Sequence, residues 1–243
     1  MVCDKHGIEY EDVQQEIAGR IFHFGMCAEC SKEVAEAEKE MQERQKHDSS
    51  LSFYTYANIE PSYYDVSFDN FIADTDDLKR AKACVEKMAT EKHGKIIMLG
   101  KNGTGKTHLA VCAVKIVGGK ILTMYEISTR IRATYTPRAK EDELDVVDEL
   151  ARIPLLVIDE IGRTKGSDAE TNWLSYIIDK RHVRDLPLIL ISNKHIRRSC
   201  EKQGCNDCLE NYISEDILSR LSEDGIRLQF GGIDYRMKKR QEK

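Results

Sequence analysis

The stretch GKNGTGKT, residues 100–107, decides the fold of this chain of 243 residues. It fits the pattern G-x-x-x-x-G-K-[ST], in which glycines let the backbone curl so that its N–H groups point at a phosphate. The apolar run Ile96–Leu99 before it predicts a buried strand. The residues from His108 onward predict a helix whose positive end faces the same anion. This order of elements predicts a loop that binds the phosphates of ATP, with a chance glycine turn as the alternative.

The chemistry of the side chains in this loop predicts their roles. The Lys106 ammonium can reach the β- and γ-phosphates, and the Thr107 hydroxyl can coordinate Mg²⁺. The predicted nucleotide-binding residues are Gly100, Asn102, Gly103, Thr104, Gly105, Lys106, Thr107 and His108.

Two further apolar runs end in polar side chains. Leu155–Ile158 leads into Asp159 and Glu160, and Leu188–Ile191 leads through one serine into Asn193. Because ligands of open α/β sheets bind at the carboxyl ends of strands, we expect Asp159 to hold Mg²⁺ and Glu160 to orient an attacking water. Asn193 is expected to hydrogen-bond the γ-phosphate or that water, or else simply terminates a strand. An acid beside the Mg²⁺ aspartate favours hydrolysis over phosphate transfer to a metabolite.

From about Val66 onward, apolar runs alternate with amphipathic stretches. Nearly continuous apolar strands predict an α/β fold in which helices cover both faces of a parallel sheet. The predicted strands are residues 95–99, 120–125, 155–159, 186–192 and 226–230. The predicted helices are residues 78–92, 105–117, 127–135, 141–152, 169–184 and 215–222.

The remainder of the chain suggests three divisions. Residues 1–47 are expected to form an N-terminal module with a charged helix from Ser31 to His47, residues 48–66 a linker, and residues 67–243 the ATPase domain. No run of about 18 apolar residues predicts a membrane span, and the N-terminus does not have the pattern of a signal peptide, so a cytoplasmic location is expected. The net charge of −5 argues against general nucleic-acid binding and requires a local basic patch for any DNA contact.

Two close ligand pairs stand in the N-terminal module. Cys3-x-x-His6 and Cys27-x-x-Cys30 have the spacing of a Zn²⁺ site, and a module this small needs such a metal to fold. His23 is an alternative fourth ligand. The competing interpretation is four unlinked residues in a disordered start.

Together these features resemble the DnaC-type helicase loaders and the related IstB-type transposition ATPases, which are P-loop proteins of the AAA+ class. The resemblance runs from Ser67 to Arg236. Its motifs are SFDNF at 67–71, GTGKTHLA at 103–110, LLVIDEIG at 155–162, IIDKR at 177–181 and ILSRL at 217–221.

The resemblance implies a five-stranded AAA+ sheet preceded by a zinc module, and slow, DNA-stimulated ATP hydrolysis during loading of the replicative hexameric DNA helicase. It implies that the N-terminal module grips the helicase. Arg220 resembles the arginine finger that reaches the ATP of the next subunit, which implies self-association.

The family also carries a helix that contacts single-stranded DNA between its second and third strands. In this chain that region holds the predicted DNA contacts Arg130, Arg132, Tyr135 and Arg138. Cationic side chains there would follow the phosphates, and the tyrosine would stack on a base. An ordinary solvated helix face is the alternative.

The sequence departs from the family in two places. Cys200, Cys205 and Cys208 follow the Asn193 strand and would bind a metal only if a fourth ligand such as His195 joined them. The short tail after Phe230 leaves no room for the helical lid of larger AAA+ proteins. Three other functions remain open: a transposition helper ATPase, a small-molecule kinase, and a nucleotide-binding module that does not hydrolyse.

Overall fold

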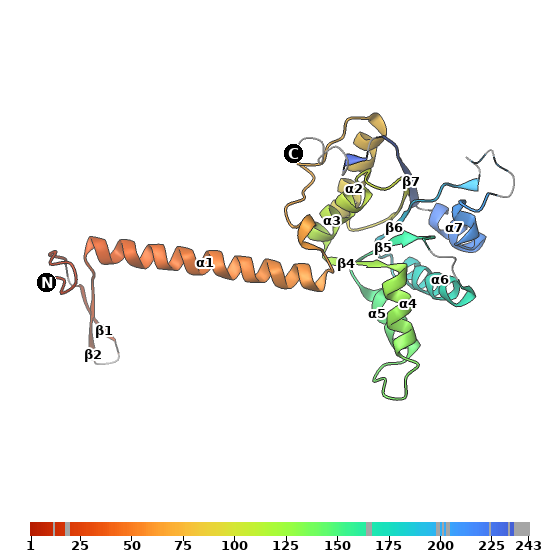
Figure 1. Cartoon of the computed structure of the whole chain (residues 1–243). Coiled ribbons are helices and arrows are strands. Elements are labelled where there is room, and N and C mark those ends of the chain that lie inside the picture. The colour runs from red at the N-terminus through yellow and green to blue at the C-terminus, as the bar shows by residue number, and fades with distance from the viewer. Residues whose placement is uncertain are drawn as a thin grey trace. The chain divides into compact units, whose positions relative to one another are not determined.

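The computed structural model describes residues 1–11, 13–17, 20–163, 167–197, 200, 202, 205–223, 225–232 and 234–235. It divides into two compact units, Met1–Phe53 and Tyr54–Lys243 (Figure 1). None of the described helices is long and apolar enough to cross a membrane.

The larger unit is built on a five-stranded sheet in which every pairing is parallel. Its strand order is β4-β5-β6-β3-β7, so the strand that precedes the glycine-rich loop lies inside the sheet rather than at an edge. The strands are β3 (Lys95–Gly100), β4 (Gly119–Thr123), β5 (Leu155–Ile161), β6 (Leu188–Ser192) and β7 (Gly225–Phe230). This order brings the carboxyl ends of β3, β6 and β5 side by side.

Helices cover both faces of this sheet, as Figure 1 shows. On one face lie α2 (Asp76–Glu91) and α3 (Lys106–Val117). The other face is covered by α4 (Met124–Ala133), α5 (Glu143–Arg152), α6 (Asp168–Val183) and α7 (Glu215–Glu223). The predicted three-layer α/β fold is therefore confirmed.

The period of two along each strand explains why both layers form. Leu156 and Ile158 of β5 pack into one apolar cluster with the helices α4 to α7. Their neighbours Leu155 and Val157 are equally buried but point to the opposite face, which α3 covers. A strand buried on both sides reads as the unbroken apolar run that the sequence shows.

The smaller unit contains an antiparallel hairpin of β1 (Val13–Ile17) and β2 (Arg20–Phe24), followed by most of α1 (Ala28–Tyr56). None of the α1 residues is buried. A helix that is polar on all sides matches the charged composition that the sequence shows.

The helix α1 differs in length from the predicted helix, which was expected to end at His47 and to give way to a linker. It continues through Tyr56, so the first part of the predicted linker is helical. The Tyr54 ring, near its end, stacks on Tyr64 with ring centroids 4.3 Å apart, and Ala57 just beyond is fully buried. The Tyr54 and Ala57 contacts lie at the end of the helix, away from its polar part. The sequence has no helical period there that would predict them.

Candidate functional site

The glycine-rich loop joins β3 to α3 in a conformation that needs its glycines. Gly103 and Gly105 have φ angles of 75° and 94°, in the left-handed region that other residues rarely adopt. A Cβ on Gly105 would lie 2.7 Å from the Phe71 ring. That ring also meets His108 edge-on at 5.3 Å between centroids, and the His108 imidazole Nε2 lies 3.0 Å from the Ser67 carbonyl oxygen. The segment 67–71 therefore packs against the start of α3 and shapes the loop.

The loop holds its own lysine at the phosphate-facing side. Lys106 is only 5% exposed, and its ammonium donates to the carbonyl oxygens of Gly100 at 2.7 Å and Lys101 at 2.6 Å. The next residue, Thr107, donates from its hydroxyl to the Asp159 Oδ2 atom at 3.0 Å. The two predicted Mg²⁺ ligands, Thr107 on α3 and Asp159 on β5, therefore lie side by side.

Asp159 stands in a setting that suits a cation. Burial raises the pKa of its carboxyl, while the Glu160 N–H, 2.6 Å from Oδ1, and the Thr107 hydroxyl partly offset that rise. The half-buried Asp159 carboxylate and the Thr107 hydroxyl both offer oxygen atoms, the kind of ligand that Mg²⁺ prefers. These side chains therefore fit the group that the phosphate loop predicts.

The backbone at Glu160 is strained and irregular. Its φ angle is 59°, and the register between β5 and β6 shifts between Ile158 and Ile161. A bulge of this kind redirects side chains at the end of a strand. Both Glu160 carboxylate oxygens lie 2.6 Å from the Arg163 guanidinium. Arg163 was not among the residues predicted from the sequence, where its spacing of three residues from Glu160 was the available signal.

All of the predicted nucleotide-binding residues except Gly100 line one cleft of about 1050 Å³. It contains the phosphate loop from Asn102 to His108 together with Asp159, Glu160 and Asn193. Asn193 follows β6, which lies between the strands that carry the loop and the two acids. The volume lies just above the range of roughly 300–1,000 Å³ that is usual for ligand pockets.

The segment expected to be a linker contributes a second wall of the cleft. Asn58, Ile59 and Tyr63 line it. The Asn58 amide donates to the Ile121 carbonyl oxygen at 2.9 Å and to a Glu126 carboxylate oxygen at 3.0 Å, which fixes this wall to β4 and α4. Sequence reasoning missed these residues because the segment has no helical or strand period.

Arg220 does not line the cleft of its own chain. It lies on α7, half-exposed, and forms an ion pair with Asp179 of α6. Both residues belong to the motifs quoted above. The ion pair keeps the guanidinium on the outer surface of the helical layer.

The predicted DNA contacts lie around the hairpin of α4 and α5, whose connecting loop protrudes from the sheet (Figure 1). Three of the four have carboxylate partners in the same chain, and Arg138 is exposed. The pairs are Arg130–Glu149, Arg132–Glu170 and Tyr135–Glu143. The hairpin therefore presents mixed charge, and DNA phosphates would compete with these acids.

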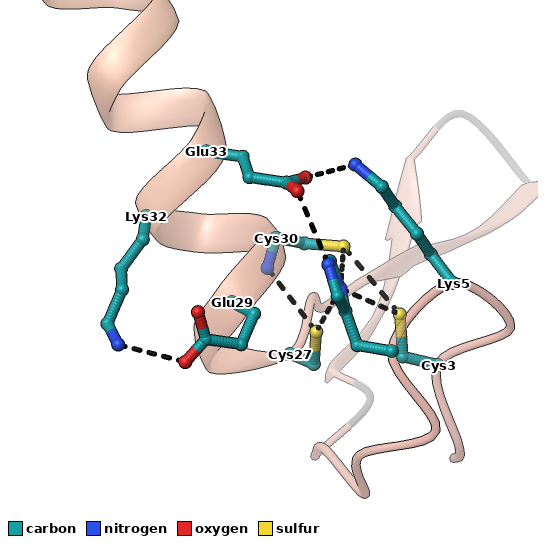
Figure 2. Close-up of polar contacts among 8 residues, drawn as sticks. Cys3, Lys5, Cys27, Glu29, Cys30, Lys32 and Glu33 are labelled. Carbon is teal, nitrogen blue, oxygen red and sulfur yellow. Dashed lines mark hydrogen bonds and ion pairs between the residues drawn. The ribbon is translucent and has the colours of Figure 1, made fainter.

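The predicted zinc ligands converge in the smaller unit. Figure 2 shows the sulfurs of Cys3, Cys27 and Cys30 pointing at one another. The Cys27 and Cys30 sulfurs each lie 3.3 Å from the His6 Nδ1 atom, and the Cys3 sulfur lies 3.6 Å from that of Cys30. All four ligand atoms lie within 4.8 Å of one another. The side chain of His23, the alternative ligand, lies outside the described side chains.

Neighbouring groups orient these ligands. The His6 Nε2 atom lies 3.3 Å from a Glu33 carboxylate oxygen, which favours the tautomer with Nδ1 free to bind a metal. The Cys30 N–H lies 3.4 Å from the Cys27 sulfur. Hydrogen bonds, chiefly from the His6 backbone, lower the pKa of Cys3 to about 6, whereas the contact with Cys3 raises the pKa of Cys30 to about 12. Crowded thiols of this kind are the donor set that Zn²⁺ takes.

Comparisons with known proteins agree with this arrangement. The sequence profile of the family described as IstB-like ATP binding protein matches residues 32–243. The chain is 28% identical over 190 residues to the replicative helicase loader DnaC of Escherichia coli (strain K12), covering 75% of this chain and 77% of that protein. It is also 28% identical over 145 residues to DnaC of Buchnera aphidicola subsp. Acyrthosiphon pisum, covering 56% of this chain and 59% of that one. The crystal structure of the DnaC helicase loader superimposes with a TM-score of 0.58 at 21% identity, covering 71% of this chain and all of that one.

Proposed function

The chain belongs to the family of IstB-like ATP-binding proteins, which has the AAA+ fold, and from that premise we propose that it is an ATP-hydrolysing loader of a replicative DNA helicase. One observation carries the proposal. The phosphate loop, Asn193 and the Asp159–Glu160 pair follow three adjacent parallel strands and line a single cleft. Groups that grip a triphosphate and groups that activate water then face the same space.

The catalytic roles that we assign follow from this layout. Lys106 and the loop N–H groups bind the β- and γ-phosphates, and Thr107 and Asp159 hold Mg²⁺, which when bound neutralises charge on the phosphates. Glu160 orients and polarises the attacking water once its carboxylate is released from Arg163. Asn193 hydrogen-bonds the γ-phosphate or that water.

We further propose that hydrolysis depends on assembly. Arg220 is on the outer surface of α7 and away from the cleft of its own chain, so it is suited to reach the nucleotide of a second copy. If the Arg220 guanidinium left Asp179 and bound the γ-phosphate of that nucleotide, it would stabilise the negative charge of the transition state of hydrolysis. Self-association of this kind makes ATP turnover a switch.

We assign residues 1–47 to partner binding, with Zn²⁺ held by Cys3, His6, Cys27 and Cys30, and residues 67–243 to the ATPase. The convergence of the four ligand atoms supports the metal, and the similarity to DnaC supports a hexameric helicase as the partner. Arg130, Arg132, Tyr135 and Arg138 are proposed to contact single-stranded DNA, with the phosphates displacing their carboxylate partners.

The decisive experiment is an affinity capture from host extract with wild type and Lys106→Ala, each with and without ATP, followed by identification of the retained proteins. The helicase should be retained by wild type with ATP and reduced with Lys106→Ala. Glu160→Gln should bind ATP normally but lose hydrolysis by roughly 100-fold or more, since it lacks the acid that orients the water.

One control variant and two possible outcomes separate the alternatives. Cys27→Ser with Cys30→Ser should lose the helicase while retaining ATP binding. Retention of a transposase in place of a helicase would identify the IstB-type helper function. Absence of any ATP affinity in the presence of Mg²⁺ would overturn the whole proposal.

A further inference from the structure

A second cluster of metal-binding side chains lies in the larger unit, outside the nucleotide cleft. It consists of His195, Cys200, Cys205 and Cys208, whose ligand atoms all lie within 4.8 Å of one another. We propose that these four residues form a second, structural zinc site that fixes the segment between β6 and α7. The three cysteines alone were an ambiguous signal, because nothing in their spacing shows that His195 joins them.

The distances fit a single ion. The His195 Nε2 atom lies 3.5 Å from the Cys205 sulfur and 3.5 Å from the Cys208 sulfur. Zinc bonds of about 2.3 Å to sulfur and about 2.0 Å to nitrogen give a tetrahedron with edges of roughly 3.5 to 3.8 Å. These two nitrogen-to-sulfur separations are those that a mononuclear Cys₃His site requires, and the Cys200 sulfur lies within 4.8 Å of the other three ligand atoms. An iron–sulfur cluster would hold its cysteines further apart, because the cluster atoms lie between them.

The backbone around Cys205 and Cys208 has the form of a metal-binding turn. The Asp207 N–H lies 3.4 Å from the Cys205 sulfur, the same kind of N–H to sulfur contact that Cys30 makes with Cys27 in the smaller unit. The His195 and Cys208 backbones form a parallel bridge, with the His195 N–H donating to the Asp207 carbonyl oxygen at 3.3 Å. These bonds set the histidine beside the two cysteines without any ion.

Outer contacts hold this turn in place. The Lys194 ammonium donates to an Asp207 carboxylate oxygen at 2.7 Å and lies 4.9 Å from the centre of the Tyr212 ring. The Asn211 amide donates to the Cys205 carbonyl oxygen at 2.8 Å. Ligands whose supports are themselves hydrogen-bonded lose little freedom when the metal binds.

The position of the cluster gives it a role. His195 stands two residues after Asn193, the proposed γ-phosphate sensor. At the other end, Cys208 is followed by Leu209, which is 1% exposed in the same apolar cluster as Leu221 of α7. A metal there ties the strand end that carries Asn193 to the helix that carries Arg220. Among the described residues between β6 and α7, the regular structure is limited to the η3 turn (Leu209–Asn211) and the His195–Cys208 bridge, so the ion would fix the distance between Asn193 and Arg220.

Metal analysis of the purified full chain tests the proposal. We expect two zinc ions per chain in wild type, one in Cys205→Ser with Cys208→Ser, and one in Cys27→Ser with Cys30→Ser. Cys84→Ser, which alters a cysteine outside both clusters, should leave the content at two. A wild-type content of one ion, lost entirely in the N-terminal variant, would overturn the second site.

A second measurement keeps the test independent of folding in the Cys205 and Cys208 variant. The Cys27→Ser with Cys30→Ser protein, whose second cluster is intact, is exchanged into Co²⁺. We expect the ligand-field and sulfur charge-transfer bands of one tetrahedral Cys₃His cobalt site. Absence of these bands refutes the site, and iron with the absorption of a cluster refutes the choice of zinc. Neither the zinc content nor the cobalt spectrum depends on ATP hydrolysis.

Discussion

Glu160 occupies a backbone conformation that costs free energy. Its φ angle of 59° places its Cβ close to the following carbonyl, a strain that glycine would not have. Strained residues persist where the surrounding structure imposes them, and here the bulge between β5 and β6 does so. The strain aims the carboxylate into the cleft from the end of a buried strand.

Replacement of Glu160 by glycine and by alanine separates this strain from the loss of the carboxylate. Both variants should lose ATP hydrolysis. Both also lose the ion pair between Glu160 and Arg163, but this solvent-exposed ion pair contributes little to stability. Glu160→Gly should be more stable than Glu160→Ala by about 1 kcal/mol, because only glycine relieves the left-handed backbone. Urea unfolding of the two proteins without nucleotide measures the difference. Equal stability would show that the backbone relaxes when the side chain is shortened.

Asp159 gives a prediction on pH. Burial raises the pKa of Asp159 above its usual range, so the folded protein holds this proton more tightly than the unfolded chain. The resulting contribution to stability is present in acid and is lost as pH rises through the folded pKa. Once ionised, the carboxylate therefore destabilises the metal-free protein.

Asp159→Asn should unfold at higher urea concentration than wild type at pH 7 without nucleotide. The difference in urea midpoint between Asp159→Asn and wild type should narrow as pH falls. It should vanish below about pH 3.9, the usual pKa of aspartate. The exposed Asp69→Asn serves as a matched control and should not change the midpoint. A gap that widens toward acid would show that the pKa of Asp159 is lowered.

At the scale of elements, Arg181 joins α5, α6 and β6. Its guanidinium is fully buried, and it donates to the carbonyl oxygens of Leu150, Ile153, Pro154 and Pro187. Burial lowers the pKa of this arginine, and the carbonyls stabilise its charge. The residue belongs to the family motif at 177–181, yet its contacts are structural.

Arg181→Met should destabilise the protein by about 3 kcal/mol or more, because several buried carbonyls lose their donor at roughly 1–3 kcal/mol each. Its neighbour Lys180 forms a partly exposed ion pair, at 3.8 Å, with Asp148 and lies 4.9 Å from the centre of the Tyr176 ring. Lys180→Met is therefore the control, with an expected loss below about 1 kcal/mol. Thermal or urea unfolding of both variants makes the comparison, and similar losses would contradict the role given to the four carbonyls.

The elements differ in how well they can be predicted from the sequence. The strand Leu155–Ile161 was predictable because its side chains are apolar on both faces, and the phosphate loop was predictable because few sequences satisfy its glycine and lysine spacing. The bulge at Glu160 was not, since it arises from pairing with β6, a partner distant in sequence. Nor was the wall around Asn58, which depends on one amide that bonds to β4 and α4. The local spacing of apolar residues predicts helices and strands. The bulge at Glu160 and the wall around Asn58 depend instead on tertiary contacts.

At the scale of the whole molecule, the two units should respond separately to loss of metal. The β1–β2 hairpin is too small to be stable alone, so the proposed zinc in the smaller unit supplies its folding energy. The phosphate loop belongs to the other unit.

Cys27→Ser with Cys30→Ser should therefore make residues 1–27 sensitive to protease, while the Kd for ATP changes by less than about twofold. Limited proteolysis with mass spectrometry and a nucleotide titration measure the two effects. A large loss of ATP affinity would show that the units are coupled.

The last described residues lie on the phosphate loop. The Tyr235 N–H donates to the Gly103 carbonyl oxygen at 3.0 Å, and a Cβ on Gly103 would lie 1.8 Å from an Asp234 carboxylate oxygen. Tyr235 also lines the proposed nucleotide cleft beside this loop. In the proposed ATPase, a segment that takes no part in bond cleavage would therefore influence how fast the spent nucleotide leaves.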